Sequence, residues 1–130
     1  MKFLDSTFLI DFLRSDSKAV SIASKLSNEF LATSSINIFE VMLGIYLDSN
    51  KSEEKLNKFR DLVNNLNIFS FDVDDSLIAS RIAAQLIKDG GMIDDLDSLI
   101  VGVMKANNIF EIITRDKHFS RIKGIKVLSY

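Results

Sequence analysis

The first thirteen residues, MKFLDSTFLIDFL (1–13), decide the fold class. Residues 2–4 form a short apolar run typical of a β-strand, and this run ends at Asp5. Ser6 and Thr7 then offer N-cap chemistry for a helix, because apolar residues recur at helical spacing over residues 8–13. The segment therefore predicts a strand that leads directly into a helix.

The same alternation continues along the chain. Further strands are predicted at 29–34, 67–71, 109–114 and 126–129, and helices at 17–26, 36–47, 53–66, from a cap at Asp74 or Asp75 to Ile87, 97–105 and 117–122. Gly90 and Gly91 provide the stop after the helix that ends at Ile87. Alternating strands and helices favour right-handed crossovers and a parallel sheet with helices on both faces. We therefore predict an α/β fold of three layers, with a central, mostly parallel sheet of four to five strands, in one domain over residues 1–130.

Composition excludes several function classes. The chain has 130 residues, a formal charge of −2, no Cys and one His. These counts exclude disulfide frameworks, thiol nucleophiles and the paired histidines of a zinc-protease helix. Neither common phosphate-binding glycine loop occurs among the five Gly. The absence of cysteine suits the cytoplasm, where we expect the protein to reside.

The sequence predicts no membrane segment. A spanning helix needs roughly 20 mostly apolar residues, and the longest apolar run is Val41 to Leu47. The apolar N-terminus is not typical of a signal peptide, because Asp5 and Asp11 interrupt it and no small-residue cleavage site follows.

Carboxylates follow the predicted strands. Asp5 comes directly after the first strand, Asp72 after the third, and Asp116 shortly after the fourth. Because ligands bind at the carboxyl ends of parallel strands, these side chains are expected at one edge of the sheet. Glu40 and Asp97 are further candidates on two apolar helices.

Glu40 is the only charged residue between Ile36 and Leu47. An unpaired buried carboxylate is costly, so a metal ion or another cation is the obvious partner. Gly44 lies one turn further on the same helix face and leaves room for a ligand. The alternative is that Glu40 lies at the wet edge of an otherwise buried helix.

Each of the other acids also has a structural explanation. Asp5 and Asp97 are suited to capping helices, Asp116 to a turn after a strand, and Asp94 and Asp95 to a loop or cap. The coincidence of Asp5, Glu40, Asp97 and Asp116 at one edge nevertheless favours a functional site. Clustered carboxylates require cations, and oxygen ligands without a Cys or His cluster favour Mg²⁺ or Mn²⁺.

The densest basic stretch surrounds Asp116. Arg115, Lys117, Arg121 and Lys123 are candidates for phosphate contacts to RNA or DNA, which would position the substrate without reading its sequence. His118 is a possible general base, although a single surface histidine is more often incidental.

Four segments together resemble the PIN-domain family, most closely the VapC-type toxin ribonucleases of toxin–antitoxin pairs. They are FLDSTFLIDFL (3–13), INIFEVMLG (36–44), GMIDDLDSLIV (91–101) and IITRDKHFSRIKGIKV (112–127). The resemblance covers essentially the whole chain and implies a PIN-like fold and metal-dependent cleavage of RNA.

The resemblance also implies the site and the partners. Asp5, Glu40, Asp97 and Asp116 match the acidic quartet that holds Mg²⁺ or Mn²⁺ in the family, and Thr114, with Ser6, is a possible auxiliary residue. A homodimer and a small VapB-like antitoxin are implied as partners. Ser6-Thr7 stands where many relatives have Thr-Asn, and Val101 stands where a small Ala is common.

Two alternatives come from other functional classes. A phosphoacceptor receiver domain has a similar length, but it needs paired acids after its first strand, where this chain has Ser6 and Thr7. A PIN-like module that binds RNA without cleaving it is the other alternative. Apolar residues such as Phe12, Leu13, Ile45 and Tyr46 belong either to the core or to an interface.

Overall fold

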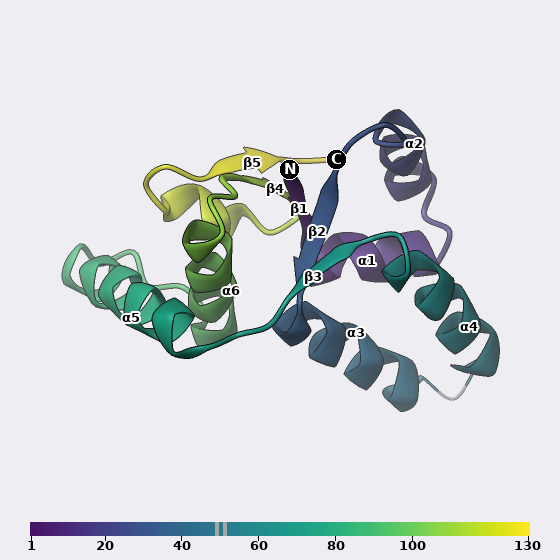
Figure 1. Ribbon diagram of the computed structural model, residues 1–130, viewed down its shortest axis with the longest axis horizontal. Coiled ribbons are helices and arrows are strands. Elements are labelled where there is room, and N and C mark those ends of the chain that lie inside the picture. The colour runs from purple at the N-terminus through teal and green to yellow at the C-terminus, as the bar shows by residue number, and fades with distance from the viewer. Residues whose placement is uncertain (49, 51) are drawn as a thin grey trace.

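A five-stranded parallel sheet forms the centre of the computed structural model (Figure 1), which describes residues 1–130 except Ser49 and Lys51. The strand order is β3-β2-β1-β4-β5, and every neighbouring pair is parallel. The strands are β1 (Lys2–Leu4), β2 (Leu31–Ser34), β3 (Asn67–Phe69), β4 (Glu111–Ile113) and β5 (Lys126–Leu128). The predicted α/β class and parallel sheet are confirmed.

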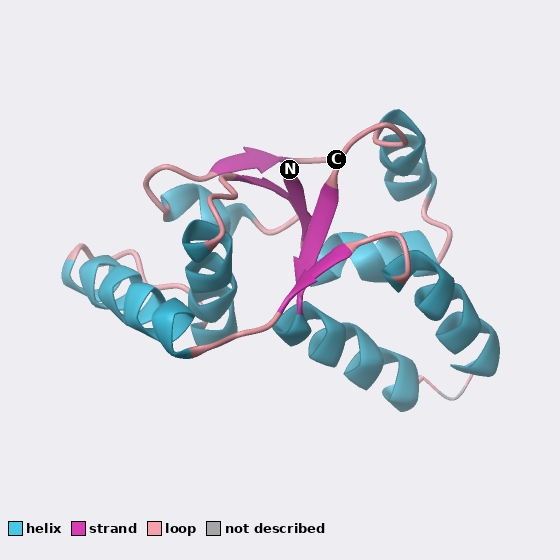
Figure 2. Cartoon of the chain, viewed as in Figure 1, coloured by secondary structure: helices cyan, strands magenta, loops and turns pink. Residues whose placement is uncertain are grey.

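Helices cover both faces of the sheet, as Figure 2 shows. The helices are α1 (Ser6–Leu13), α2 (Ser17–Lys25), α3 (Ser35–Leu47), α4 (Ser52–Val63), α5 (Val73–Lys88), α6 (Asp95–Ala106) and the short 3-10 helix η1 (Lys117–Arg121). In Figure 1, α1 to α4 lie on one side of the sheet and α5 and α6 on the other. No helix in the described part of the chain is long and apolar enough to cross a membrane.

Two hydrophobic cores result from the alternation of side chains along the strands. Phe3 packs with Ile100, Met104 and other residues on the side of α5 and α6. The next residue, Leu4, packs with Phe8 and other residues on the side of α1 to α4. Both strand residues are at most 1% exposed, so β1 anchors both layers and fixes the position of Asp5 at its end.

Close packing between α5 and α6 depends on Gly102. A Cβ at this position would lie 2.5 Å from the backbone oxygen of Asp75 and 2.8 Å from Cβ of Ala79. The two helices therefore approach each other at a distance that only glycine permits. The predicted stop after α5 is also observed, because Gly90 adopts a φ of 71°.

Two predicted caps are wrong. The cap of α5 is Asp72, which forms a capping box with Asp75, whereas the sequence predicts Asp74 or Asp75. Asp72 accepts the backbone N–H of Asp75, and the Asp75 side chain accepts that of Asp72. At α1 the N-cap position is occupied by Asp5, so Ser6 and Thr7 lie inside the helix.

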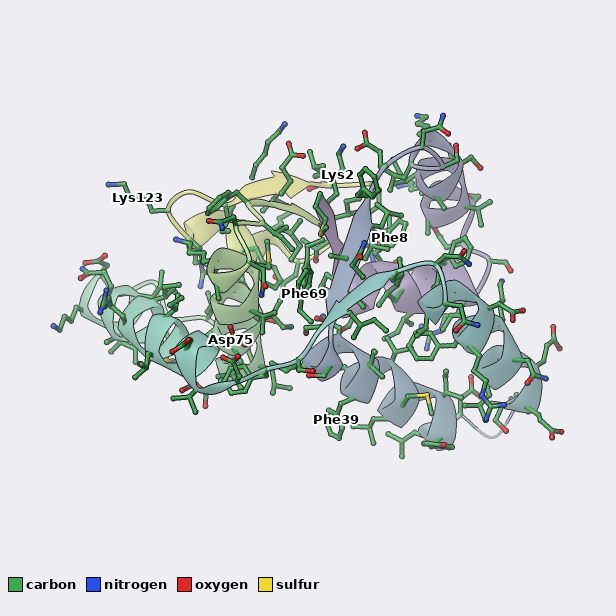
Figure 3. The ribbon with its side chains drawn as sticks, in the orientation of Figure 1. Lys2, Phe8, Phe39, Phe69, Asp75 and Lys123 are labelled. Atoms are coloured by element: carbon green, nitrogen blue, oxygen red, sulfur yellow. The ribbon has the colours of Figure 1, made fainter. Side chains whose placement is uncertain are left out.

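Helix α3 is buried along one face only. Only Asn37, Val41 and Ile45 are buried on it. Its outer face carries the exposed apolar side chains of Phe39, Leu43, Tyr46 and Leu47. Figure 3 shows Phe39 pointing away from the body of the molecule. Leu13 and Ile45 therefore belong to the core, whereas Tyr46 is 67% exposed.

Candidate metal centre

The four predicted carboxylates come from four separate elements of the fold. Asp5 follows β1, Asp116 follows β4, Glu40 lies on α3, which follows β2, and Asp97 lies in the first turn of α6. Because β2, β1 and β4 are adjacent and parallel, three of the four elements start from the same edge of the sheet.

Asp5 is held by side-chain donors. Its carboxylate makes no capping hydrogen bond to the described backbone of α1. Oδ2 accepts hydrogen bonds from the hydroxyls of Thr7 at 2.8 Å and Thr114 at 2.7 Å, and Oδ1 accepts one from Nδ2 of Asn37 at 3.3 Å. The residue is only 3% exposed. Helix capping therefore does not explain this carboxylate.

Glu40 is connected to Asp5 through two neutral residues. The Ser6 hydroxyl donates a hydrogen bond to Oε2 of Glu40. Ser6 Oγ in turn accepts a hydrogen bond of 2.9 Å from Asn37 Nδ2, the same amide nitrogen that reaches Asp5. Burial raises the pKa of Glu40, the Ser6 hydrogen bond lowers it, and the negative charges of Asp5 and Asp94 raise it further. Glu40 therefore faces other acids across the site.

Asp97 is partly buried among other acids. Burial, followed by the charges of Asp5, Asp116, Asp94 and Glu40, raises the pKa of Asp97 to about 7. The cap of α6 is Asp94, which accepts the backbone N–H of Leu96 at 3.0 Å, as a loop or cap role for Asp94 predicts. The capping explanation is therefore wrong for Asp97.

Asp116 lies beside the single histidine of the chain. It caps η1 by accepting the backbone N–H of His118 at 2.8 Å, so its turn role is also present. Nδ1 of His118 lies 3.1 Å from Oδ1 of Asp116. One ligand atom from each of Asp97, Asp116 and His118 lies within 4.8 Å of the other two. Asp5 and Glu40 are outside this compact group.

The residues present fit a divalent cation. Burial and mutual repulsion oppose the ionised form of Asp97 and Glu40. Among the described residues, no Lys or Arg forms an ion pair with Asp5, Glu40, Asp97 or Asp116. A bound cation would relieve this repulsion, and the mainly carboxylate donors match the preference of Mg²⁺ or Mn²⁺.

Two supporting residues were not found from the sequence. Thr7 binds Asp5 and also lies 3.1 Å from Thr114, measured between hydroxyl oxygens. Asn37 is fully buried, and Ser34 Oγ donates a hydrogen bond of 2.6 Å to its Oδ1. The available signal was Asn37 itself, a polar residue within an otherwise apolar helix segment. His118, considered incidental from the sequence, also lies at the site.

The predicted phosphate-binding residues have different surroundings. Arg115 contacts the carboxylate of Asp11, with Nε 2.6 Å from Oδ2. Arg121 donates a hydrogen bond of 2.9 Å to the backbone oxygen of Met92. Lys117 and Lys123 are exposed. Arg115 therefore already has an ion-pair partner within the protein.

A comparison with protein-family models matches the PIN domain over residues 2–125. The chain belongs to the PIN domain family. PIN domains are generally nucleases that use divalent metals, which agrees with the acidic cluster. Membership of the PIN domain family also excludes the alternative that the chain is a receiver domain.

Solved structures of the same fold include toxin–antitoxin complexes. FitAcB from Neisseria gonorrhoeae has 23% sequence identity and a TM-score of 0.85, with 98% of this chain and 96% of that chain covered. VapBC-1 from nontypeable Haemophilus influenzae has 24% identity and a TM-score of 0.81 at the same coverages. VapBC2 from Rickettsia felis, bound to a promoter DNA fragment, has 21% identity and a TM-score of 0.83, with 99% and 98% covered. No curated protein sequence matches the chain.

Proposed function

We propose that the chain is a metal-dependent endoribonuclease that hydrolyses RNA phosphodiester bonds, with residues 1–130 forming one PIN domain. The observation that carries this proposal is the environment of Asp97, whose pKa is raised to about 7 by burial and by four surrounding acids. Perturbed pKa values of this kind cluster at functional sites, and a bound cation would neutralise the repulsion. Family membership supports a nuclease as the kind of enzyme.

In this proposal Asp5, Glu40, Asp97 and Asp116 hold Mg²⁺ or Mn²⁺. The bound ion would supply Lewis-acid chemistry, activating water and stabilising charge on the phosphate oxygens. Thr114 orients Asp5 through the hydrogen bond to Oδ2, and Ser6 orients Glu40. His118 contacts Asp116 and joins the same group of candidate ligand atoms.

Basic residues beyond Asp116 would bind the phosphates of the substrate. We assign this role to Lys117, Arg121 and Lys123, all of which are exposed on or after η1. The Arg115 side chain is 56% exposed despite its ion pair with Asp11, so its outer edge remains available to a phosphate.

We further propose that the protein is the toxin of a type II toxin–antitoxin pair, acts in the cytoplasm, and pairs with a VapB-like antitoxin. The support is the shared fold with chains from VapBC and FitAcB complexes. The exposed apolar residues of α3, including Phe39 and Leu43, are consistent with an interface and with the homodimer implied by the family resemblance.

Cleavage of a labelled, structured RNA by the purified protein tests the enzymatic proposal. The reaction is run with EDTA, Mg²⁺ or Mn²⁺, and the Asp5→Asn variant is purified and assayed in parallel. We expect cleavage that requires metal and is lost in the variant. Equal cleavage by both proteins would identify a contaminating nuclease. Absence of cleavage across a panel of cellular RNAs would favour the non-catalytic binding module instead.

A further inference from the structure

A second charged feature lies between α5, α6 and η1. It is a cleft of about 500 Å³ whose charged lining residues are Arg81, Lys105, Arg121, Lys123 and Asp89. The four cations come from α5, α6, η1 and the turn that follows η1. The basic cleft, as we call it, is therefore assembled by the fold from distant parts of the sequence.

The cations of the basic cleft are not neutralised. In the described part of the chain, none of the four forms an ion pair, whereas Lys2 pairs with Glu29 and Lys126 with Glu111. Asp89, the one acid of the cleft, accepts a hydrogen bond of 3.0 Å from Gln85. The cleft therefore carries excess positive charge, although the whole chain has a formal charge of −2.

Two internal hydrogen bonds hold the walls of the cleft together. Lys105 Nζ donates to the backbone oxygen of Lys123 at 2.8 Å, and Arg121 Nη1 donates to that of Met92 at 2.9 Å. Each bond uses only one of several donors on its side chain. Positive groups held in place with donors to spare are suited to binding phosphate oxygens.

The lining of the basic cleft is not purely charged. Ile82, which is half-buried, also lines it, together with the buried Leu86 and Ile122 beneath. The small apolar surface that Ile82 presents between the cations suits a ligand that alternates phosphates with flat, weakly polar groups. Single-stranded RNA has this chemistry, since its bases are unstacked and free to contact apolar surfaces.

Two segments of the chain contribute both to the basic cleft and to the cluster of Asp5, Glu40, Asp97 and Asp116. Arg121 ends η1, the helix that Asp116 caps. The Arg121 side chain also holds Met92, which lies in the segment that leads to Asp94 and α6. The chain therefore links the basic cleft directly to Asp116 and to the start of α6, which carries Asp97.

We propose that the basic cleft binds the phosphates of single-stranded RNA that flank the bond to be cut. This inference rests on the proposed ribonuclease function and extends it with Arg81 and Lys105, two residues far in sequence from the basic stretch that follows Asp116. The cleft would contribute to substrate affinity and would not touch the reacting phosphate.

Arg81→Gln is the most direct variant for testing the cleft, because Arg81 is exposed on α5 and its loss removes charge without removing a described hydrogen bond. Binding of a fluorescent single-stranded oligouridine is measured in the Asp97→Asn background at several salt concentrations. Each lost phosphate contact lowers the salt slope by about 0.7, which corresponds to about fivefold weaker binding near 0.1 M salt. We expect about this loss for Arg81→Gln and about twice the slope change for Arg81→Gln with Lys123→Gln.

The matched controls are Arg60→Gln and Arg81→Lys. Arg60 is exposed on α4, at the opposite end of the molecule from α5 (Figure 1), and we expect its variant to bind as the parent does. Arg81→Lys keeps the charge and should retain most of the affinity. Equal effects of Arg60→Gln and Arg81→Gln would overturn the proposal for the cleft.

Failure of the cleft and failure of the proposed function give different results. RNA cleavage by the unmutated protein, with no binding defect in Arg81→Gln, would leave the ribonuclease intact and remove the cleft. A binding defect specific to Arg81→Gln, in a protein that cleaves no RNA with Mg²⁺ or Mn²⁺, would support the cleft as an RNA site and overturn the enzymatic proposal.

Discussion

Arg115 forms a bidentate ion pair with Asp11, with Nε 2.6 Å from Oδ2 and Nη2 3.0 Å from Oδ1. Tyr130 also donates its hydroxyl hydrogen to Oδ2 of Asp11, at 2.7 Å. Burial and the hydrogen bond to Asp11 raise the pKa of Tyr130, so this hydroxyl remains a donor. Because Arg115 precedes Asp116, the pair ties the loop that carries a candidate metal ligand to α1.

Loss of this pair should destabilise the fold. Asp11 is 6% exposed, so Asp11→Ala leaves a guanidinium and a phenol without their acceptor. We expect the free energy of unfolding to fall by about 2 kcal/mol, less than for a fully buried pair because half of Arg115 is exposed. Urea unfolding measures the change. Lys126→Ala, which breaks an exposed pair with Glu111, should cost below about 1 kcal/mol; equal losses would contradict the account.

The Thr114 hydroxyl links two of the candidate ligands. It donates to Oδ2 of Asp5 at 2.7 Å and accepts the backbone N–H of Asp116 at 2.9 Å. Thr114→Val removes both hydrogen bonds at nearly constant volume, and we expect Mn²⁺ affinity to fall by about 10-fold or more. Thr114→Ser keeps the hydroxyl and should bind nearly as the parent does. Isothermal titration with Mn²⁺ tests both, and unchanged affinity in Thr114→Val would exclude the orienting role.

Asp97 should make the stability of the metal-free protein depend on pH. Its pKa is about 7 in the folded chain, against the ordinary value of 3.8. Folding therefore favours the protonated form, and the resulting stabilisation is complete below pH 3.8 and is lost as the pH rises through about 7. We expect Asp97→Asn, which cannot ionise, to melt on the order of 5 °C above the parent near pH 8 and close to it near pH 4.

Calorimetry in EDTA across this pH range measures the difference between the two proteins. Asp95→Asn is the matched control, because Asp95 is an exposed acid in the same first turn of α6. Its melting profile should follow that of the parent. Profiles of Asp97→Asn and the parent that remain parallel at all pH values would show that Asp97 does not experience the predicted repulsion.

Sequence patterns predicted the order of strands and helices because local periodicity and turn residues specify them. The carboxyl ends of parallel strands meet at one edge of the sheet, so the positions of Asp5 and Asp116 at that edge could be predicted. The contact between Thr7 and Thr114 could not be predicted, because these two residues meet only after the sheet forms. Whether Tyr46 on α3 belongs to the core or to the surface was left open, because an apolar residue type does not show what covers the side chain.

Cap positions show a second limit of local patterns. Asp72, Asp74 and Asp75 are all acceptable N-caps by residue type, and the reciprocal hydrogen bonds of Asp72 and Asp75 decide between them. The role of Arg115 was equally hidden, because nothing local indicates that it meets Asp11 on α1.

Divalent metal should raise the thermal stability of the protein. A ligand that binds only the folded state stabilises it by about 2.7 kcal/mol at 100 times its Kd. We therefore expect Tm to rise with Mn²⁺ or Mg²⁺ in the parent. The increase should be much smaller in Asp5→Asn, because a ligand held by Thr7, Thr114 and Asn37 is lost. A Tm that does not respond to saturating metal would argue against a preformed site.

The most direct test of the central claim is Mn²⁺-dependent RNA cleavage by the parent, Asp97→Asn and Asp95→Asn under identical conditions. Both variants lose one acid from the first turn of α6, but only Asp97 faces the other carboxylates. The account predicts loss of cleavage in Asp97→Asn and near-parental cleavage in Asp95→Asn, with all three proteins folded by circular dichroism. Full cleavage by Asp97→Asn would contradict it.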